Sequence, residues 1–221
     1  MPNRVQILST EMVTHNVRHY RVEKPENFQF APGQATELSI DTDQWRDEKR
    51  PFTFTSRPEE DTLEFTIKSY FDHEGVTQAL WGCEPGTRLL LREAWGTIQY
   101  KGPGIFIGGG AGVTPFIAIL RDLQAKGQLQ GNRLIASHKR REDIILRDEF
   151  EAMAGLEPLW TLSEEKDAGL PHGRIDRDFL KAHIADFDQN FYLCGPDAMV
   201  ETLRQDLEAL GARVSALTWE N

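Results

Sequence analysis

The sequence of 221 residues lacks the features that hold metals, disulfide frameworks or nucleic acids. Its two cysteines, Cys83 and Cys194, are too few for a disulfide framework or a four-thiolate iron–sulfur cluster, and no spacing of histidine and cysteine suggests a zinc site. The formal net charge of −10 is spread over both halves, without the basic stripe that binds phosphate backbones. We therefore expect no metal and no nucleic acid partner.

Long hydrophobic runs are also missing. The stretch from Gly102 to Leu120 carries no charge and approaches the ~20 residues of a membrane span. It is rich in Gly and Pro, however, and a lipid-exposed helix could not satisfy its backbone through such a cluster. We expect no membrane span. The N-terminal segment MPNRVQILSTEM has no secretory or transit pattern, so a cytoplasmic location is expected.

The first hundred residues show short alternating runs separated by turns, which predicts an all-β domain. One run places Val13, His15 and Val17 on one face, and others span 38–40 and 63–67. Turn signals such as Pro32-Gly33 and Glu84-Pro85-Gly86 have spacings suited to a small antiparallel barrel. At this length two domains are expected, and we place them at 1–101 and 102–221.

From residue 102 the pattern changes to apolar strands followed by amphipathic helices, which indicates a parallel sheet covered on both faces. Strands are expected at 105–107, 133–137, 159–162 and 191–194. The helical stripes that should cover them are Phe116, Ile119, Leu120 and Leu123, then Met199, Leu203, Leu207 and Leu210, closed by Gly211.

The glycine-rich stretch GIFIGGGAGVTPFIAIL, residues 104–120, lies at the first strand-to-helix turn of this half. Thr114 is a suitable N-cap and Pro115 suits the first helical position. Backbone N–H groups at such a turn can hold a phosphate, although the spacing fits neither a Walker loop nor GxGxxG. A second junction, FYLCGPDAM at 191–199, has the same form. The alternative is that these glycines only permit close packing of helix on sheet.

In the β half, two segments carry chemistry. KRPFTFTSRP at 49–58 sets Arg50, which suits an anion, before an aromatic and several hydroxyls; the alternative is an ordinary strand with an exposed arginine. Alternation places Phe52 and Phe54 on one face and Thr53 on the other. HEGVTQALWG at 73–82 predicts a short helix that ends at Gly82 and whose start could hold phosphate.

Taken in order, RPFTFTS, GVT, WGTI, GGGAGVTP and CGPDAM resemble the ferredoxin–NADP reductase superfamily, especially short flavodoxin-reductase-like members without a fused iron–sulfur domain. The resemblance spans nearly the whole chain. It implies a six-stranded antiparallel β-barrel that binds FAD, with FMN the less favoured flavin, followed by a Rossmann-like parallel-sheet domain that binds NAD(P)H. Hydride would pass from nicotinamide to flavin, and electrons would leave singly for an acceptor protein such as flavodoxin or ferredoxin.

The resemblance also implies roles for individual residues. Thr53 would hydrogen-bond the hydride-accepting flavin nitrogen and Cys194 would border the nicotinamide, so these two are the catalytic candidates. The flavin-binding candidates are Arg50, Pro51, Phe52, Thr53, Ile67, Lys68, Gly75, Val76, Thr77 and Trp219. The candidates for the nicotinamide nucleotide are Gly109, Gly110, Gly112, Val113, Thr114, Ser163, Cys194, Gly195 and Pro196.

Three departures from the family pattern matter. Phe52 and Thr53 stand where several members have Tyr and Ser. Trp219 could cover the flavin, but Leu217 replaces a carboxylate found in many relatives, so a proton-relay role for Glu220 is not expected. Glu164 occupies a place where NADP-specific members often have Arg, and a carboxylate there would repel a 2′-phosphate. We therefore expect NADH, with Lys139-Arg140-Arg141 and Arg174 as nearby cations.

Two other functions fit the same motifs. A flavin reductase would use flavin as a released substrate and need no protein partner. A non-catalytic nucleotide-binding module would keep the fold without reducing flavin, and replacement of Arg50 and Thr53 would then matter little. The sequence does not identify the electron acceptor.

Overall fold

The computed structural model describes residues 2–72, 74–96, 98–167, 169–213 and 217–219. The chain folds as two compact units. Unit 1 comprises 1–96 together with 114–122, and unit 2 comprises 97–113 together with 123–221. The predicted domain limits of 1–101 and 102–221 are not tested by this grouping, because one helical segment is assigned across them. In the part of the chain that is described, no helix combines the length and apolarity required to cross a bilayer.

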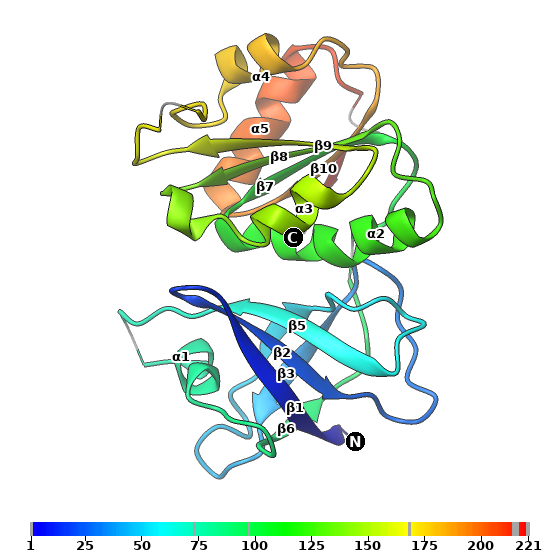
Figure 1. Cartoon of the computed structure of the whole chain (residues 1–221), viewed down its shortest axis with the longest axis vertical. Helices are drawn as coiled ribbons and strands as arrows, with labels where there is room; N and C mark the ends of the chain where they lie inside the picture. Colours follow the sequence, from blue (N-terminus) through cyan, green and yellow to red (C-terminus); the bar gives the residue numbers. More distant parts are fainter. Residues whose placement is uncertain (1, 73, 97, 168, 214–216, 220–221) are drawn as a thin grey trace. The chain divides into compact units, whose positions relative to one another are not determined.

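Residues 2–96 of unit 1, as far as they are described, form a six-stranded antiparallel sheet with one short helix (Figure 1). The sheet order is β4-β3-β6-β1-β2-β5. Past the end of β4, the Thr55 amide donates to the Glu64 carbonyl of β5 at 2.8 Å, which joins the two end strands and closes the barrel. The elements are β1 (Asn3–Thr14), β2 (Val17–Glu23), β3 (Ala35–Ile40), β4 (Arg50–Thr53), β5 (Thr62–Lys68), α1 (Val76–Trp81) and β6 (Arg88–Leu91).

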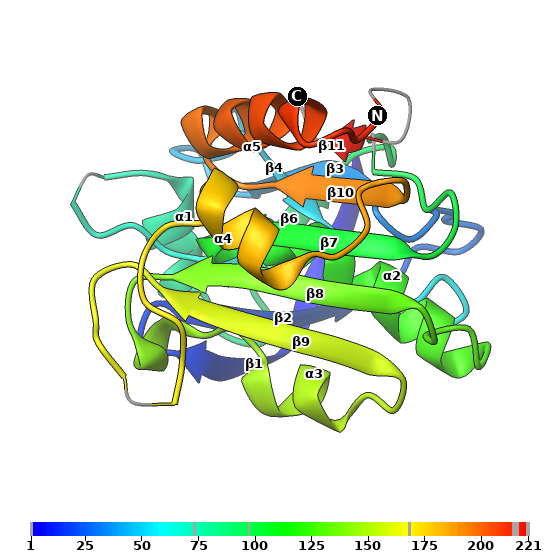
Figure 2. The same cartoon turned by 90° about the horizontal axis from the view of Figure 1, so that it is seen from above.

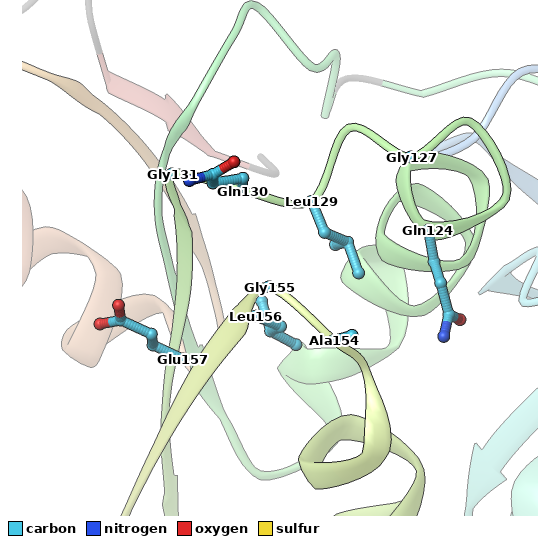
Figure 3. A pocket seen from close by; sticks show the side chains of 9 residues that line it. All are labelled: Gln124, Gly127, Leu129, Gln130, Gly131, Ala154, Gly155, Leu156 and Glu157. Atoms are coloured by element: carbon cyan, nitrogen blue, oxygen red, sulfur yellow. The ribbon is translucent and has the colours of Figure 1, made fainter.

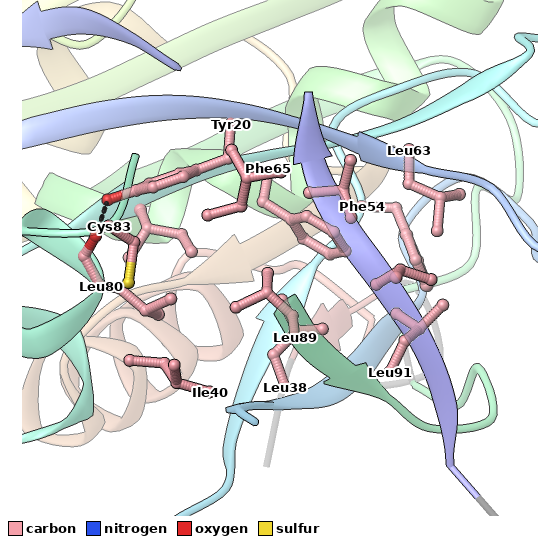
Figure 4. Close-up of a cluster of buried hydrophobic side chains, with 14 of the residues drawn as sticks. Tyr20, Leu38, Ile40, Phe54, Leu63, Phe65, Leu80, Cys83, Leu89 and Leu91 are labelled. Atoms are coloured by element: carbon pink, nitrogen blue, oxygen red, sulfur yellow. Dashed lines mark hydrogen bonds between the residues drawn. The ribbon is translucent and has the colours of Figure 1, made fainter. Parts of the chain in front are cut away.

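The barrel interior is filled by aromatic and aliphatic side chains that alternate inward along the strands (Figure 4). Phe54 is fully buried and stacks on Phe30 at 4.2 Å, with Phe65 at 5.3 Å. Tyr20 donates its hydroxyl to the Leu80 carbonyl at 3.0 Å, which holds α1 against the barrel and satisfies a buried polar atom. One expected strand is wrong: β1 and β2 form a hairpin that pairs Thr14 with Val17.

Unit 2 contains a parallel sheet in the order β11-β10-β7-β8-β9. Figure 1 shows α4 and α5 over one face of this sheet and α3 over the other, and Figure 2 shows its strands side by side. Its elements are β7 (Gly104–Gly109), η1 (Gly110–Val113), β8 (Asn132–His138), η2 (Arg141–Asp143), α3 (Arg147–Ala152), β9 (Leu156–Leu162), α4 (Arg177–His183), β10 (Asn190–Cys194), α5 (Asp197–Ala209) and β11 (Leu217–Trp219). Helix α2 (Thr114–Ala125) follows η1 directly and is shared between the two units.

The apolar residues of unit 2 occupy both faces of the sheet, as a doubly covered parallel sheet requires. Ile105 and Ile107 of β7 pack in a cluster with α4 and α5. Phe106, between them in sequence, stacks on Tyr192 of β10 at 4.4 Å. The predicted stripe of α2 is buried, and in α5 Leu203 and Leu207 are buried while Met199 and Leu210 are partly so.

Candidate functional site

Two glycine turns meet in unit 2 at the point where the strand order reverses. Strands β8 and β9 follow β7 on one side, whereas β10 and β11 lie on its other side. The carboxyl ends of β7 and β10 are adjacent, because Cys194 pairs with Gly108 in parallel register. In wound parallel sheets, ligands bind at such a reversal, beyond the carboxyl ends of the strands.

The glycines of this edge serve two different purposes. A Cβ on Gly112 would collide with the backbone of Cys194 and lie 2.7 Å from the Gly195 Cα, so the two turns touch because side chains are absent. Packing therefore explains Gly112. Gly110 differs: its φ is +55° and an added Cβ would meet no heavy atom within 4 Å. Gly110 leaves the outer side of the turn open, where backbone N–H groups can receive an anion.

Helical structure begins at Gly110, earlier than the predicted N-cap at Thr114. The 3-10 turn η1 covers Gly110–Val113 and runs directly into α2. The glycine turn itself is thus the start of a helix, with its amides aligned along the axis.

Acidic residues are distributed unevenly over the helix starts, which tests whether phosphate fits. Neither η1 nor α2 has an acidic residue in its first turn, and α1 has none. Helices α3, α4 and α5 each carry at least one. A carboxylate beside the positive end of a helix repels a phosphate. The helix starts predicted to hold phosphate are those whose first turn carries no carboxylate. The residues fit a dinucleotide at this edge.

Cys194 and its neighbours occupy the other side of the reversal. Cys194 ends β10 and is 8% exposed, Gly195 follows with a φ of +157°, which L side chains rarely adopt, and Pro196 precedes α5. A Cβ on Gly109 would lie 3.2 Å from the Pro196 ring and would strike the Met199 sulfur. The sequence predicted Met199 only as a core residue of a helix. Its position directly after CGPDA was the feature of the sequence that could have indicated its contact with the glycine turn.

Ser163 lies at the same carboxyl edge, beyond β9. Its amide donates to the His138 carbonyl at the end of β8, at 2.8 Å. Next to it, Glu164 Oε1 accepts from Lys139 Nζ at 2.9 Å, an exposed ion pair. A hollow of about 490 Å³ nearby is lined by Arg140, Arg141, Glu142 and Glu165. Mixed charge therefore surrounds the place where the ribose end of a coenzyme is expected.

The flavin candidates of unit 1 lie on three adjoining segments. Arg50, Pro51, Phe52 and Thr53 form β4, Ile67 and Lys68 end β5, and Gly75, Val76 and Thr77 begin α1. Just after β5, Ser69 Oγ donates to the Thr77 carbonyl at 2.8 Å, so the end of β5 and the start of α1 are in contact. Gly75 is the N-cap of α1 and has an extended backbone. As a glycine it has no side chain that could accept a hydrogen bond from the first-turn amides of this helix.

In β4 and just after it, Phe52 and Phe54 share the inner side of the barrel, as alternation predicts. Phe52 is partly buried and packs against the barrel core, and Phe54 lies within it. Thr53 pairs with Ala35 of β3 and is half-buried. Arg50 is exposed, with Nη1 donating to the Lys49 carbonyl at 2.8 Å and Nη2 3.6 Å from Glu48 Oε2. Such a loose surface pair is weak, so Arg50 can turn to another anion.

Trp219 lies in β11, where its backbone pairs with Leu193 of β10. Its side chain and Glu220 fall outside the described residues, so the predicted cover over the flavin stays a prediction. A larger hollow, of about 620 Å³, lies at the amino ends of β8 and β9 (Figure 3). It is lined by Gln124, Gly127, Leu129, Gln130, Gly131, Ala154, Gly155, Leu156 and Glu157. This is the edge opposite to the glycine turns, and we do not assign the coenzyme to it.

Comparison with known proteins identifies both halves. Residues 2–82 match an FAD-binding domain, and residues 106–205 match an oxidoreductase NAD-binding domain. The ferredoxin–NAD(P)+ reductase component of the naphthalene 1,2-dioxygenase system of Pseudomonas putida is 26% identical over 93% of this chain. The propane 2-monooxygenase reductase component of Mycolicibacterium smegmatis is 28% identical over 93%. The chain spans 64% and 63% of the lengths of these relatives.

Solved structures agree in fold. The FAD/NAD-binding domain of nitric oxide dioxygenase from Vibrio cholerae superposes with a TM-score of 0.88 at 18% identity, covering 100% of this chain and 98% of that one. A ferredoxin NADP+ reductase from Neisseria gonorrhoeae with bound FAD and NADP gives 0.86 at 20% identity, covering 99% and 98%. The two-domain arrangement of six antiparallel strands followed by a parallel sheet is therefore confirmed.

Proposed function

Because this chain belongs to the ferredoxin–NADP reductase superfamily, we propose that it is a flavoprotein reductase that oxidises NADH, carries the electrons on bound FAD and delivers them to a separate acceptor protein. The observation that supports this most directly is the absence of acidic residues from the first turns of α1 and of η1 with α2, whereas the other α-helices begin with carboxylates. These two starts are where the phosphates of a flavin and of a nicotinamide nucleotide would be held.

When bound, the nicotinamide supplies a hydride, and the flavin accepts it and releases electrons one at a time. The protein binds and orients the two groups. Arg50 and the first-turn amides of α1 hold the flavin phosphates, and the Thr53 hydroxyl hydrogen-bonds the flavin ring. The open side of Gly110 receives the coenzyme phosphates, and Cys194 presents a small, polarizable side chain that leaves a flat ring room to lie beside it. Orientation of this kind replaces acid–base machinery.

We propose NADH as the preferred coenzyme, because Glu164 stands near Ser163 and would repel a 2′-phosphate. Lys139 offsets part of that charge at 2.9 Å, so the preference should be moderate. The acceptor is proposed to be a ferredoxin, a flavodoxin or an oxygenase component, since the two relatives described above are reductase components of a dioxygenase and a monooxygenase system. We place the reaction in the cytoplasm, a reducing compartment that suits two buried thiols.

The test is anaerobic mixing of the purified protein with NADH and, separately, NADPH, while the flavin absorbance is followed. We expect a yellow protein with one FAD per chain that bleaches faster with NADH. Thr53→Val should slow bleaching by at least about tenfold, whereas Thr53→Ser, which keeps a hydroxyl, should retain most of the rate. Arg57→Gln is the control, because it replaces one partner of the ion pair between Arg57 and Glu60.

The other functions give different results. A colourless protein that reduces added flavin with NADH would be a flavin reductase. A protein that binds nucleotide, takes up no flavin and reduces none would be a non-catalytic module, and either result would contradict the proposal.

A further inference from the structure

Helix α2 is tied to the barrel by a charged side chain that the sequence did not single out. Arg121 Nη1 donates to Glu64 Oε2 on β5 at 3.0 Å and to the Thr55 carbonyl at 2.8 Å. All three residues belong to unit 1. The side chains of Arg121 and Glu64 are 20% and 17% exposed, so the ion pair is far better shielded from water than most in this protein. One guanidinium nitrogen thus contacts the two strand segments that close the barrel.

The acceptor side of this contact is fixed before Arg121 is considered. The Glu64 amide donates to Ser56 Oγ at 3.0 Å, and its carbonyl accepts from the Thr55 amide. His19 Nε2 of β2 lies 3.6 Å from Glu64 Oε2. The His19 ring, followed by Arg121, holds the pKa of Glu64 below its ordinary value against the opposing effect of burial. Glu64 is therefore a charged and rigid anchor for the helix.

The position of Arg121 in the chain gives the contact its significance. Thr55 follows shortly after Thr53, and Glu64 shortly precedes Ile67 and Lys68, so the strand segments that Arg121 holds are those that carry flavin candidates. Arg121 itself lies on the helix that continues without interruption from the glycine turn at Gly110. A side chain that fixes α2 consequently fixes the amides at its start.

We propose that Arg121 is a positioning residue for the coenzyme: by holding α2 on Glu64 and Thr55 it keeps the amides of the glycine turn in place for the coenzyme phosphates. The inference rests on the proposed nicotinamide nucleotide site. Arg121 acts through the helix and is assigned no contact with either cofactor. Its loss should weaken coenzyme binding while the later transfer of electrons to an acceptor is unchanged.

The test compares Arg121→Met with wild type in the FAD-loaded protein. Titration with NAD+, which binds without turnover, should give a Kd raised by about tenfold, within the range usual for coupling between linked positions. The KM for NADH should rise similarly, whereas the rate at which chemically reduced enzyme passes electrons to ferricyanide should stay within twofold. Arg177→Met is the matched control, since it removes another arginine–carboxylate pair, to Asp206, between α4 and α5. It should leave the Kd unchanged.

Two further variants keep the test valid if Arg121→Met does not fold. Arg121→Lys keeps the charge but not the guanidinium geometry, so its Kd should lie between those of wild type and Arg121→Met. Glu64→Gln should raise the Kd in the same direction. If these variants bind NAD+ as tightly as wild type, Arg121 is merely structural and the inference is wrong. If the wild-type protein itself binds no NAD+, both the proposed function and the inference about Arg121 are wrong.

Discussion

The contact between the two glycine turns of unit 2 gives the sharpest prediction, for Gly112→Ala. Backbone strain is not involved, because Gly112 does not have a positive φ. The new methyl group would collide with the Cys194 backbone and lie 2.7 Å from the Gly195 Cα, whereas ordinary contact begins at 3.4 Å. The atoms in the way are backbone, so no side chain can rotate aside.

The cost follows from this geometry. Relief requires the ends of β7 and β10 to move apart, which disturbs the pairing of Gly108 with Cys194. Forced extra volume in a packed interior costs about 1–3 kcal/mol, and we expect the upper part of that range. A misplacement of about 1 Å at a binding turn can reduce activity about 100-fold. We therefore expect Gly112→Ala to lose roughly 3 kcal/mol of stability and to bind NAD+ at least about tenfold more weakly.

Urea unfolding and NAD+ titration measure the two quantities. Gly127→Ala is the control: its φ is +66° but a Cβ there meets nothing within 4 Å, so it should cost about 1 kcal/mol of strain without affecting NAD+. A Gly112→Ala protein within 0.5 kcal/mol of wild type, with an unchanged Kd, would show that packing between these turns is not what the glycine is for.

Three further predictions concern the barrel core, a buried carboxylate and the coenzyme edge. Phe54→Ala should lower the free energy of unfolding by about 3–5 kcal/mol in urea, because it removes a fully buried ring stacked on Phe30; a loss below 1 kcal/mol would contradict this packing. The fold lowers the pKa of Glu64 below 4.5, so its charge stabilises the protein above that pH; the stability gap between wild type and Glu64→Gln should shrink as pH falls below 4.5, and a gap that widens would refute the assignment. Glu164→Arg removes the partner of Lys139 and adds a cation, so the ratio of kcat/KM for NADPH to that for NADH should rise about tenfold; an unchanged ratio would place the 2′-position elsewhere.

The sequence predicted those features that depend on local backbone chemistry. The glycines after β7, the Gly-Pro step after β10 and the helix ended by Gly82 follow from what Gly and Pro permit. Periodicity also located β7, β8, β9 and β10 of unit 2, with ends in error by a few residues, whereas β11 was not predicted. Strand β9 begins at Leu156, before Pro158, because it lies at the edge of its sheet, where a proline costs no central hydrogen bond.

Features that depend on a reversal of the chain or on contacts between distant residues could not be predicted from the sequence. Alternation through Val13, His15 and Val17 suits a continuous strand equally well, but Thr14 Oγ1 donates to Asn16 Oδ1 at 3.1 Å within a tight hairpin. The contact of Arg121 with Glu64 joins residues far apart in the chain, and an arginine in a helical segment gives no sign of its partner in the sequence. The residue roles assigned to individual flavin and coenzyme contacts stay predictions.

The helical form of residues 110–113 has a consequence for how quickly the proposed coenzyme can bind. A phosphate-binding loop that must be ordered by its ligand pays for that ordering in entropy and delays association. Here the amides stand in a turn continuous with α2. Capture of the coenzyme should accordingly need little rearrangement, with an association rate set by encounter.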